Sequence, residues 1–261
     1  MQKVRLNDLD MNYYDNENQG KDTLVFIHGL GENLESWSYQ IEAFKSDYRV
    51  IALDVRGHGL SSDGTVDITI EQMGLDILAL LDHLNIYAAH FIGLSMGGMI
   101  CQELTKKHQS RMLSQTLANT AAFPTDAINH PLNQIIDQVK NTPIATMAEY
   151  ITKSCLPTDA NKSLYSHIFK MFKNNRQIPY VAATAATFSI DFRDVLEDIR
   201  IPTLIIVGDL DMVTPVWAAK YLHENIKNSK LVVINGAGHL TKLEKPLIFN
   251  EALAEFLQSL N

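Results

Sequence analysis

Residues 91–98 read FIGLSMGG: an apolar run ends at Gly93, one serine follows at position 95, and glycine returns at positions 97 and 98. Serine and glycine are poor helix formers, and glycine also weakens a strand, so no single regular element explains the stretch. It fits the G-x-S-x-G pattern, in which a strand turns sharply into a helix and glycines stand where side chains would collide. This turn would hold Ser95 at a strained apex above the positive end of the helix. Ser95 is therefore the predicted nucleophile.

Short, mostly β-rich apolar runs lie on both sides of this motif along the chain. They are residues 23–27 (TLVFI), 49–53 (RVIAL), 89–92 (AHFI), 114–117 (SQTL), 203–207 (TLIIV) and 230–234 (KLVVI). Their continuous apolar character predicts strands that are covered on both faces. Helical stripes, such as those in residues 70–84 and 247–260, alternate with the strands. This alternation predicts an α/β fold with a mostly parallel central sheet flanked by helices.

The first strands differ from this pattern. Residues 4–6 and 11–14 read as short strands around an Asn-Asp turn. They predict an antiparallel edge for the sheet.

Residues 121–192 interrupt the alternation. They contain helical stretches, such as 132–140, 144–154 and 160–172, separated by prolines, and no convincing strand. The segment is too long for an ordinary loop and falls between two core strands, after the serine motif. We expect a core domain of residues 1–120 and 193–261 with a helical cap, 121–192, over an active site; the alternative is a packing appendage.

A serine hydroxyl needs a base, commonly a histidine that a carboxylate orients. His239 lies in NGAGHL, between the strand 230–234 and the last helix, and is the best candidate of nine histidines. The acid is expected after the strand 203–207, where GDLDMVTP offers Asp209 and Asp211. Asp211 is predicted because it lies further into the loop, whereas Asp209 can form the turn. Asn119, after the preceding strand, cannot supply the negative charge.

Residues 28–31, HGLG, follow the strand 23–27 and match the second element of an oxyanion hole. We assign the two oxyanion-hole donors to the backbone N–H groups of Leu30 and Met96, because negative charge develops on the substrate oxygen during attack. His28 is expected to support this loop. His58, in DVRGHG, is expected to shape a turn rather than to take part in catalysis.

Composition narrows the classes of partner. The 261 residues are 46% hydrophobic, enough for one large core or for one domain with an insertion. The net charge of −8 weighs against nucleic acid and anionic membranes as partners. With no secretory signal and no membrane-spanning apolar run, a cytoplasmic protein is expected. Cys101 and Cys155 are expected to be buried or bystander thiols, and neither metal spacing nor a phosphate-binding loop predicts a metal or cofactor.

Taken together, these motifs resemble the α/β-hydrolases of the serine esterase and lactonase type, over nearly the whole chain. The matching segments are residues 28–31, 54–61 (DVRGHGLS), 93–98, 208–215 and 236–246 (GAGHLTKLEKP). GLSMGG, NTAA at 119–122 and GAGH are similar to the 3-oxoadipate enol-lactonases. HGLG departs from the Asn-Ser-Leu-Gly type of sequence that those enzymes usually carry, and favours a general carboxylesterase. Serine at position 95 argues against epoxide hydrolases and haloalkane dehalogenases, which use aspartate there.

The leading hypothesis is a cofactor-free carboxylic ester hydrolase that cleaves small to medium acyl chains through an acyl-enzyme. Its partner would be a small-molecule ester or lactone; no oligomeric state is predicted. The alternatives are a lactone hydrolase resembling the 3-oxoadipate enol-lactonases, a C–C bond hydrolase with the same triad, and a noncatalytic binding protein. The intact Ser95, Asp211 and His239 set disfavours the last.

Apolar residues of the cap segment are candidates for the substrate pocket. They are Phe123, Met147, Phe169, Met171, Phe172 and Phe188. A charged substrate would need a cationic anchor, for which the chain offers Lys140, Lys153, Lys162, Arg176 and Arg193.

Overall fold

The computed structural model describes residues 1–125 and 131–260. Within these residues, eight strands form one sheet in the order β1-β2-β4-β3-β5-β6-β7-β8. The strands are β1 (Gln2–Leu6), β2 (Leu9–Asp15), β3 (Thr23–Ile27), β4 (Arg49–Leu53), β5 (Ala89–Leu94), β6 (Met112–Ala118), β7 (Thr203–Gly208) and β8 (Ser229–Ile234). β1 and β2 pair antiparallel at one edge, and β2 continues antiparallel onto β4. The remaining pairs are parallel, which confirms the predicted α/β architecture.

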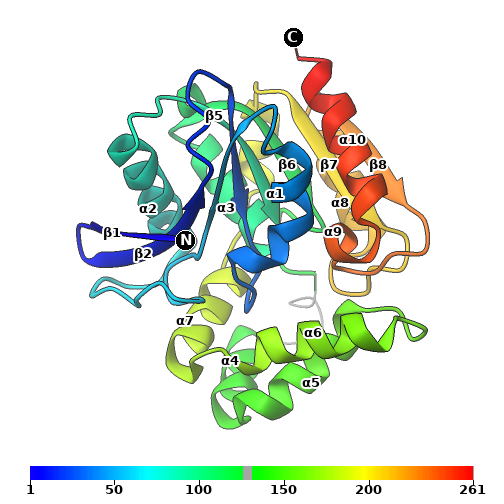
Figure 1. Cartoon of the computed structure of the whole chain (residues 1–261). Helices are drawn as coiled ribbons and strands as arrows, with labels where there is room; N and C mark the ends of the chain where they lie inside the picture. Colours follow the sequence, from blue (N-terminus) through cyan, green and yellow to red (C-terminus); the bar gives the residue numbers. More distant parts are fainter. Residues whose placement is uncertain (126–130, 261) are drawn as a thin grey trace.

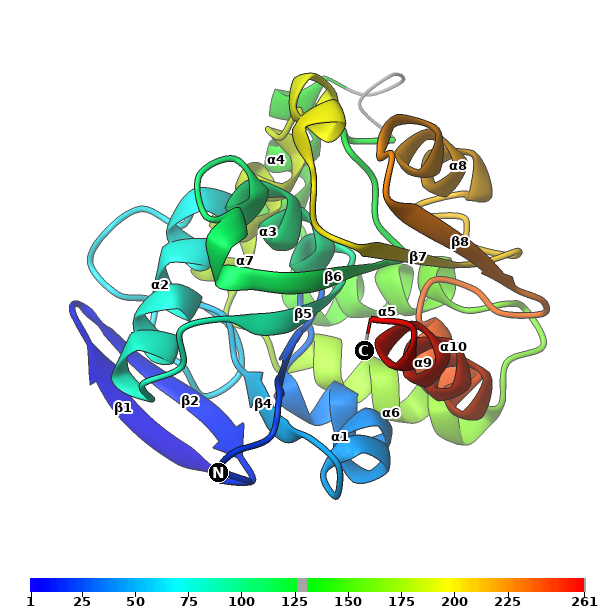
Figure 2. The ribbon, with the colours of Figure 1, turned by 90° about the horizontal axis from the view of Figure 1, so that it is seen from above.

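Helices cover both faces of the sheet (Figure 2). Those of the core are α1 (Ser38–Phe44), α2 (Ile70–His83), α3 (Met96–Thr105), α8 (Val216–Asn225), α9 (Thr241–Glu244) and α10 (Pro246–Gln258), with short 3-10 turns η1 (Leu34–Trp37), η2 (Gln109–Arg111) and η3 (Arg193–Asp198). α1 and α10 pack on one face, and α2, α3 and α8 pack on the other. The sheet therefore separates two apolar clusters.

β3 shows how a strand buried on both faces serves two clusters. All five of its residues are buried. Val25 and Ile27 belong to the cluster with α2 and α3, whereas Leu24 and Phe26 belong to the cluster with α1 and α10. Successive side chains of a strand point to opposite faces, so a continuous apolar run fills both clusters.

β8 departs from the expectation that the apolar runs would be covered on both faces. Only Ile234 of its residues is buried, and Val233 is 38% exposed. The reason is its place at the edge of the sheet, where β7 is its neighbour on one side.

Four helices stand between β6 and β7 in the described part of the segment expected to form a cap. They are α4 (Leu132–Asn141), α5 (Ile144–Cys155), α6 (Lys162–Lys173) and α7 (Gln177–Phe188). Figure 1 shows them gathered at one end of the sheet, with α5 beside α6 and α4 beside α7. Pro131 and Pro143 directly precede α4 and α5, in keeping with the preference of proline for helix starts. α7 was not among the predicted helical stretches.

No helix in residues 1–125 and 131–260 is both long and apolar enough to cross a bilayer.

Candidate active site

Ser95 occupies the turn between β5 and α3, where its backbone adopts φ 54° and ψ −115°. A positive φ is rare for a residue with a side chain, so neighbouring groups must hold it. The Ser95 N–H donates to Ala118 O at 2.9 Å, and the Ser95 carbonyl accepts from Thr120 Oγ1 at 2.8 Å. A Cβ at Gly97 would lie 2.2 Å from Ile27 O, which explains why glycine stands there. The turn thus places Ser95 at the end of the strand, facing a cavity.

His239 and Asp211 lie on the loops after β8 and β7 and are hydrogen-bonded to each other. His239 Nδ1 lies 2.9 Å from Asp211 Oδ2 and 3.1 Å from Oδ1. Asp211 also accepts from Thr214 Oγ1 at 2.8 Å and from the N–H groups of Val213 and Thr214. Because Nδ1 donates to this carboxylate, Nε2 is the imidazole nitrogen that can accept a proton.

The electrostatics of this pair favour the charged form of each partner. Burial by itself would lower the pKa of His239, but Asp211, together with Glu32 and Glu244, raises it above the ordinary value. Burial would likewise raise the pKa of Asp211, but the charge and hydrogen bond of His239 hold it low. An imidazolium is therefore stabilised here, as required of a base that takes a proton from serine.

The backbone around His239 is held from both the core and the cap. Glu244 accepts hydrogen bonds from the N–H groups of Gly238 at 2.8 Å and Leu240 at 2.9 Å. The His239 N–H donates to Cys155 O at the end of α5, also at 2.8 Å. A Cβ at Gly238 would lie 2.6 Å from the same carbonyl oxygen, so this close approach requires glycine.

The two aspartates of GDLDMVTP have different contacts. Asp209 Oδ1 accepts a hydrogen bond from the Gly236 N–H at 2.7 Å and so joins the loop after β7 to the loop after β8. Asp211 is the one that the structure brings against His239.

Asn119 has a bridging role that the sequence reasoning missed. Its side-chain Nδ2 donates to Asp211 Oδ2 at 2.8 Å and to Gly238 O at 3.2 Å. Its Oδ1 accepts from Thr241 Oγ1 at 2.5 Å. Asn119 therefore connects the aspartate loop to the histidine loop, and its hydrogen bond helps to hold the pKa of Asp211 low.

The two predicted oxyanion-hole donors, the N–H groups of Leu30 and Met96, belong to segments next to Ser95. Met96 is the first residue of α3, so its N–H has no partner within the helix. Leu30 follows Gly29, where a Cβ would lie 3.3 Å from Ser95 Cβ. Within the described residues, neither N–H donates to another protein group. Both can therefore donate to an oxygen beside Ser95.

His28 and His58 are buried away from the reacting groups. His28 Nε2 accepts from Val55 N–H at 3.0 Å, and Nδ1 donates to Gly29 O at 2.8 Å. Burial lowers the pKa of His28 to about 4 and that of His58 to about 3, so both are neutral near pH 7. His28 supports the turn at residues 28–31, as expected.

Ser95, Leu30 and His239 line one cavity of about 1010 Å³ between the core and the cap helices. Four predicted pocket residues line it: Phe123, Met147, Phe172 and Phe188. Further lining residues missed from the sequence include Glu32, Met99, Ile135, Val139, Ile151, Tyr180 and Thr184. The hydrophobic stripes of α4 and α7 would have been the signal for several of them.

Phe169 and Met171 are not among the lining residues, and their prediction as pocket residues is corrected. Both lie on α6 with Phe172, whose ring approaches the position of a Cβ on Gly31. Met171 is turned about 100° from Phe172 around the helix and is buried. Phe169, one turn earlier, packs against the apolar cluster on the α1 side of the sheet.

Lys153 is the cationic candidate that lines the cavity in the described part of the chain. It also forms an ion pair with Glu149 at 2.7 Å within α5. The other candidates lie outside the lining: Lys140, Lys162, Arg176 and Arg193.

Known families match most of the chain. Residues 22–149 match the family described as alpha/beta hydrolase fold, and residues 182–261 match the family described as TAP-like protein. Two curated relatives, 3-oxoadipate enol-lactonase 2 and 3-oxoadipate enol-lactonase 1 of Acinetobacter baylyi, are 34% and 33% identical to it. The alignments cover 97% and 91% of this chain and 95% and 89% of the relatives.

The backbone of this chain is also similar to those of solved structures. The enol-lactonase from Burkholderia xenovorans superposes with a TM-score of 0.92 at 25% identity, covering 98% of this chain and 100% of that one. A hydrolase from Pseudomonas aeruginosa gives a TM-score of 0.91 at 29% identity, covering 98% of this chain and 97% of that one.

Proposed function

Because the chain belongs to the α/β-hydrolase family and is a hydrolase, we propose that it cleaves a carboxylic ester bond through an acyl-enzyme on Ser95. The observation that carries this proposal is the joint position of Ser95 and the Asp211-paired His239 on one cavity. A hydroxyl and an oriented imidazole on one cavity wall are the groups that acyl transfer requires.

In the first half of the reaction, Ser95 Oγ attacks the carbonyl carbon and passes its proton to His239 Nε2. Asp211 accepts a hydrogen bond from His239 Nδ1–H throughout and stabilises the imidazolium with its negative charge. The carbonyl oxygen becomes an oxyanion that accepts hydrogen bonds from the N–H groups of Leu30 and Met96. The tetrahedral intermediate then collapses, the carbon–oxygen bond of the alcohol breaks, and the alcohol leaves with the proton from His239.

In the second half, water attacks the acyl-enzyme and gives a proton to His239 Nε2. A second oxyanion forms in the same hole and collapses, which releases the carboxylic acid. Ser95 Oγ takes the proton back from His239, so the protein ends as it began. Apart from the substrate and this water molecule, both halves use only groups of the chain.

The cavity favours an acyl group that is largely apolar. Aromatic and aliphatic side chains from the core and the cap make up much of its lining. Its volume of about 1010 Å³ lies at the upper end of the range for small-molecule sites, so medium acyl chains fit it as well as short ones.

A lactone is a cyclic carboxylic ester, and lactone hydrolysis is the second candidate. It is supported by the two enol-lactonases that are 34% and 33% identical to this chain. The same steps apply, except that the leaving alcohol stays attached to the acyl group. An enol-lactone of 3-oxoadipate keeps one free carboxylate, and Lys153 is the cation that the described lining offers to it.

The test is the initial rate of hydrolysis of p-nitrophenyl esters of increasing acyl length, with 3-oxoadipate enol-lactone alongside and Ser95→Ala as the control. Ester turnover that depends on Ser95 and exceeds lactone turnover supports the ester hydrolase. The reverse preference supports the lactonase. If neither is cleaved in a Ser95-dependent manner, the proposal is wrong, and a C–C bond substrate becomes the next to try.

A further inference from the structure

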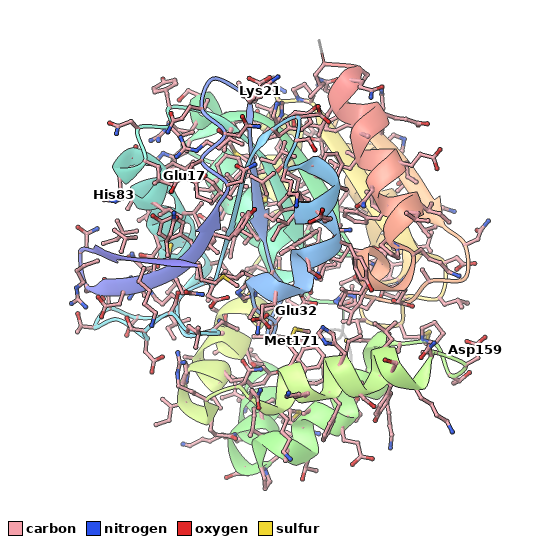
Figure 3. The ribbon with its side chains drawn as sticks, viewed as in Figure 1. Glu17, Lys21, Glu32, His83, Asp159 and Met171 are labelled. Carbon is pink, nitrogen blue, oxygen red and sulfur yellow. The ribbon has the colours of Figure 1, made fainter. Side chains whose placement is uncertain are left out.

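A buried ion pair lies beside the cavity, apart from the pair of His239 and Asp211. Lys242 Nζ lies 3.1 Å from Glu32 Oε2, and the side chains are 0% and 1% exposed. Glu32 follows the oxyanion turn at residues 28–31 and borders the cavity at the end of the core that faces the cap (Figure 3). Lys242 lies in α9, three residues after His239. The pair thus connects the two loops that must meet at a substrate carbonyl.

Glu32 holds the oxyanion turn through both polar groups of Gly29. The Gly29 N–H donates to Glu32 Oε2 at 3.2 Å, and the Glu32 N–H donates to Gly29 O at 3.1 Å. Ser36 Oγ donates to the same carboxylate oxygen at 3.1 Å. Leu30 lies inside this closed turn, so the direction of its N–H depends on Glu32.

Lys242 anchors the carboxylate from the other side. Its Nζ donates to Ser36 O at 3.1 Å and lies 4.5 Å from the centre of the Trp37 ring. The Lys242 carbonyl accepts from Gln40 Nε2 at 3.2 Å, which fixes α9 against α1.

A contribution to the stability of the fold does not by itself explain why this ion pair is buried. Taking two charges out of water costs several kcal/mol per ion, and apolar replacements of buried pairs are often neutral or stabilising. Glu32 Oε1 is also buried without a hydrogen-bond partner among the described residues, which adds to the cost of burial. Because burial of this pair costs free energy, a role in positioning the neighbouring loops explains it better.

We propose that Glu32 and Lys242 are positioning residues that hold the oxyanion turn in register with the His239 loop, so that the Leu30 N–H and the imidazole act on one carbonyl group. This inference rests on the proposed function, because it assigns a role in a reaction that forms an oxyanion beside Ser95.

The test compares Glu32→Gln, Lys242→Met and the double variant. Glutamine keeps the shape of Glu32, and methionine keeps an apolar stem against Trp37. Each single variant leaves one buried charge unpaired and should unfold at a lower temperature than the wild type, whereas the double variant should recover most of that loss. Its kcat should nevertheless stay about 10- to 100-fold below wild type, with KM within about threefold, because the oxyanion donor is misplaced.

A matched control removes a buried ion pair away from the cavity. Arg49 and Asp15 join β4 to β2 at 2.6 Å, and their side chains are 9% and 2% exposed. Asp15→Asn with Arg49→Met should change the unfolding temperature but leave kcat within about twofold of wild type, since neither residue borders the cavity.

A measurement that needs no substrate distinguishes failure of this inference from failure of the proposed function. A fluorophosphonate forms a covalent bond to an activated serine, loses fluoride, and places its phosphoryl oxygen in the oxyanion hole. If the wild type is not labelled at Ser95, the proposed function fails. If the wild type is labelled and the double variant is labelled at the same rate with an unchanged kcat, the pair is structural only and this inference is wrong.

Glu32→Asp keeps the test decisive if the double variant does not fold. It retains the charge but shortens the side chain by one methylene, so its carboxylate cannot reach both Gly29 and Lys242 as Glu32 does. Its kcat and its labelling rate should fall about 10-fold at nearly constant KM. Values within twofold of wild type would overturn the inference.

Discussion

The core and cap walls of the active-site cavity are held by different kinds of interaction. On the core side, hydrogen bonds fix the reacting groups: Asp211 contacts Asn119 and Thr214 as well as His239. On the cap side, apolar packing dominates, as in the small cluster that contains Met147 and Tyr180. Hydrogen bonds are directional, whereas apolar contacts are not. Substitutions in the core wall should therefore change the rate of the chemistry, and those in the cap wall should change which substrates fit.

Ser95→Ala is the strongest test of the core wall. It should lower kcat by about four to six orders of magnitude, because members of a triad act as a unit. The Ser95 hydroxyl has no hydrogen-bond partner in the described structure, so the unfolding temperature should stay within about 2 °C of wild type. Steady-state kinetics and thermal unfolding measure the two effects. Turnover close to wild type would remove Ser95 from the mechanism.

Asp211→Asn should have the next largest effect. The amide keeps the size of the carboxylate but removes the charge that orients and stabilises the protonated His239, so kcat should fall by about 10³- to 10⁴-fold. Asp209→Asn is the matched control, because its oxygen can still accept the Gly236 N–H, and its kcat should stay within about threefold of wild type. Equal losses in the two variants would contradict the assignment of Asp211.

The pH dependence of kcat/KM tests the electrostatics of the same wall. Asp211, Glu32 and Glu244 raise the pKa of His239 above its ordinary value of 6.5 despite burial. The base must be neutral to accept a proton, so kcat/KM should rise with pH through a pKa above 6.5 and should be several-fold lower at pH 6 than at pH 8. A profile from about pH 5 to about pH 9 measures this limb. A midpoint below 6.5 would mean that the desolvation of His239 outweighs its carboxylate neighbours.

Substitution in the cap wall should have a smaller effect than substitution of Ser95 or Asp211. Phe188→Ala enlarges the cavity and should shift the ratio of kcat/KM for long and short acyl esters by about tenfold toward the longer chain. Phe169→Ala, on the same cap but outside the lining, should leave that ratio unchanged and lower the free energy of unfolding by about 2 kcal/mol. Ester series and urea unfolding measure both. A shifted ratio in Phe169→Ala would mean that the cap acts as a whole and not through its lining.

The same division explains what could be predicted from the sequence. β3 and β4 match their predicted ranges, residues 23–27 and 49–53, because a strand buried on both faces is a continuous apolar run. Much of the turn at Ser95 is also encoded locally, since Gly93 is required by the close approach of the Gly97 backbone and Gly97 by that of Ile27 O on β3.

Features that depend on packing could not be predicted in this way. Phe169 and Phe172 are the same residue type in the same predicted helix. Only the rotation and position of α6 against the core decide which of the two lines the cavity. The pairing of Glu32 with Lys242 joins residues far apart in the chain. The chemistry of its side chain excludes Asn119 as the acid, but its use as a hydrogen-bond donor depends on where the loops after β6, β7 and β8 meet.

The hydrogen bond from the His239 N–H to Cys155 O crosses from the core to the cap, and its acceptor is a main-chain oxygen. Any residue at position 155 offers such an oxygen, provided that the chain follows the same course there. The sequence of the cap can therefore diverge over evolution, or be replaced by that of a relative, and the His239 N–H can still donate this hydrogen bond. The glycine at position 238 is the part of the contact that must be inherited unchanged, since a side chain there would strike the cap.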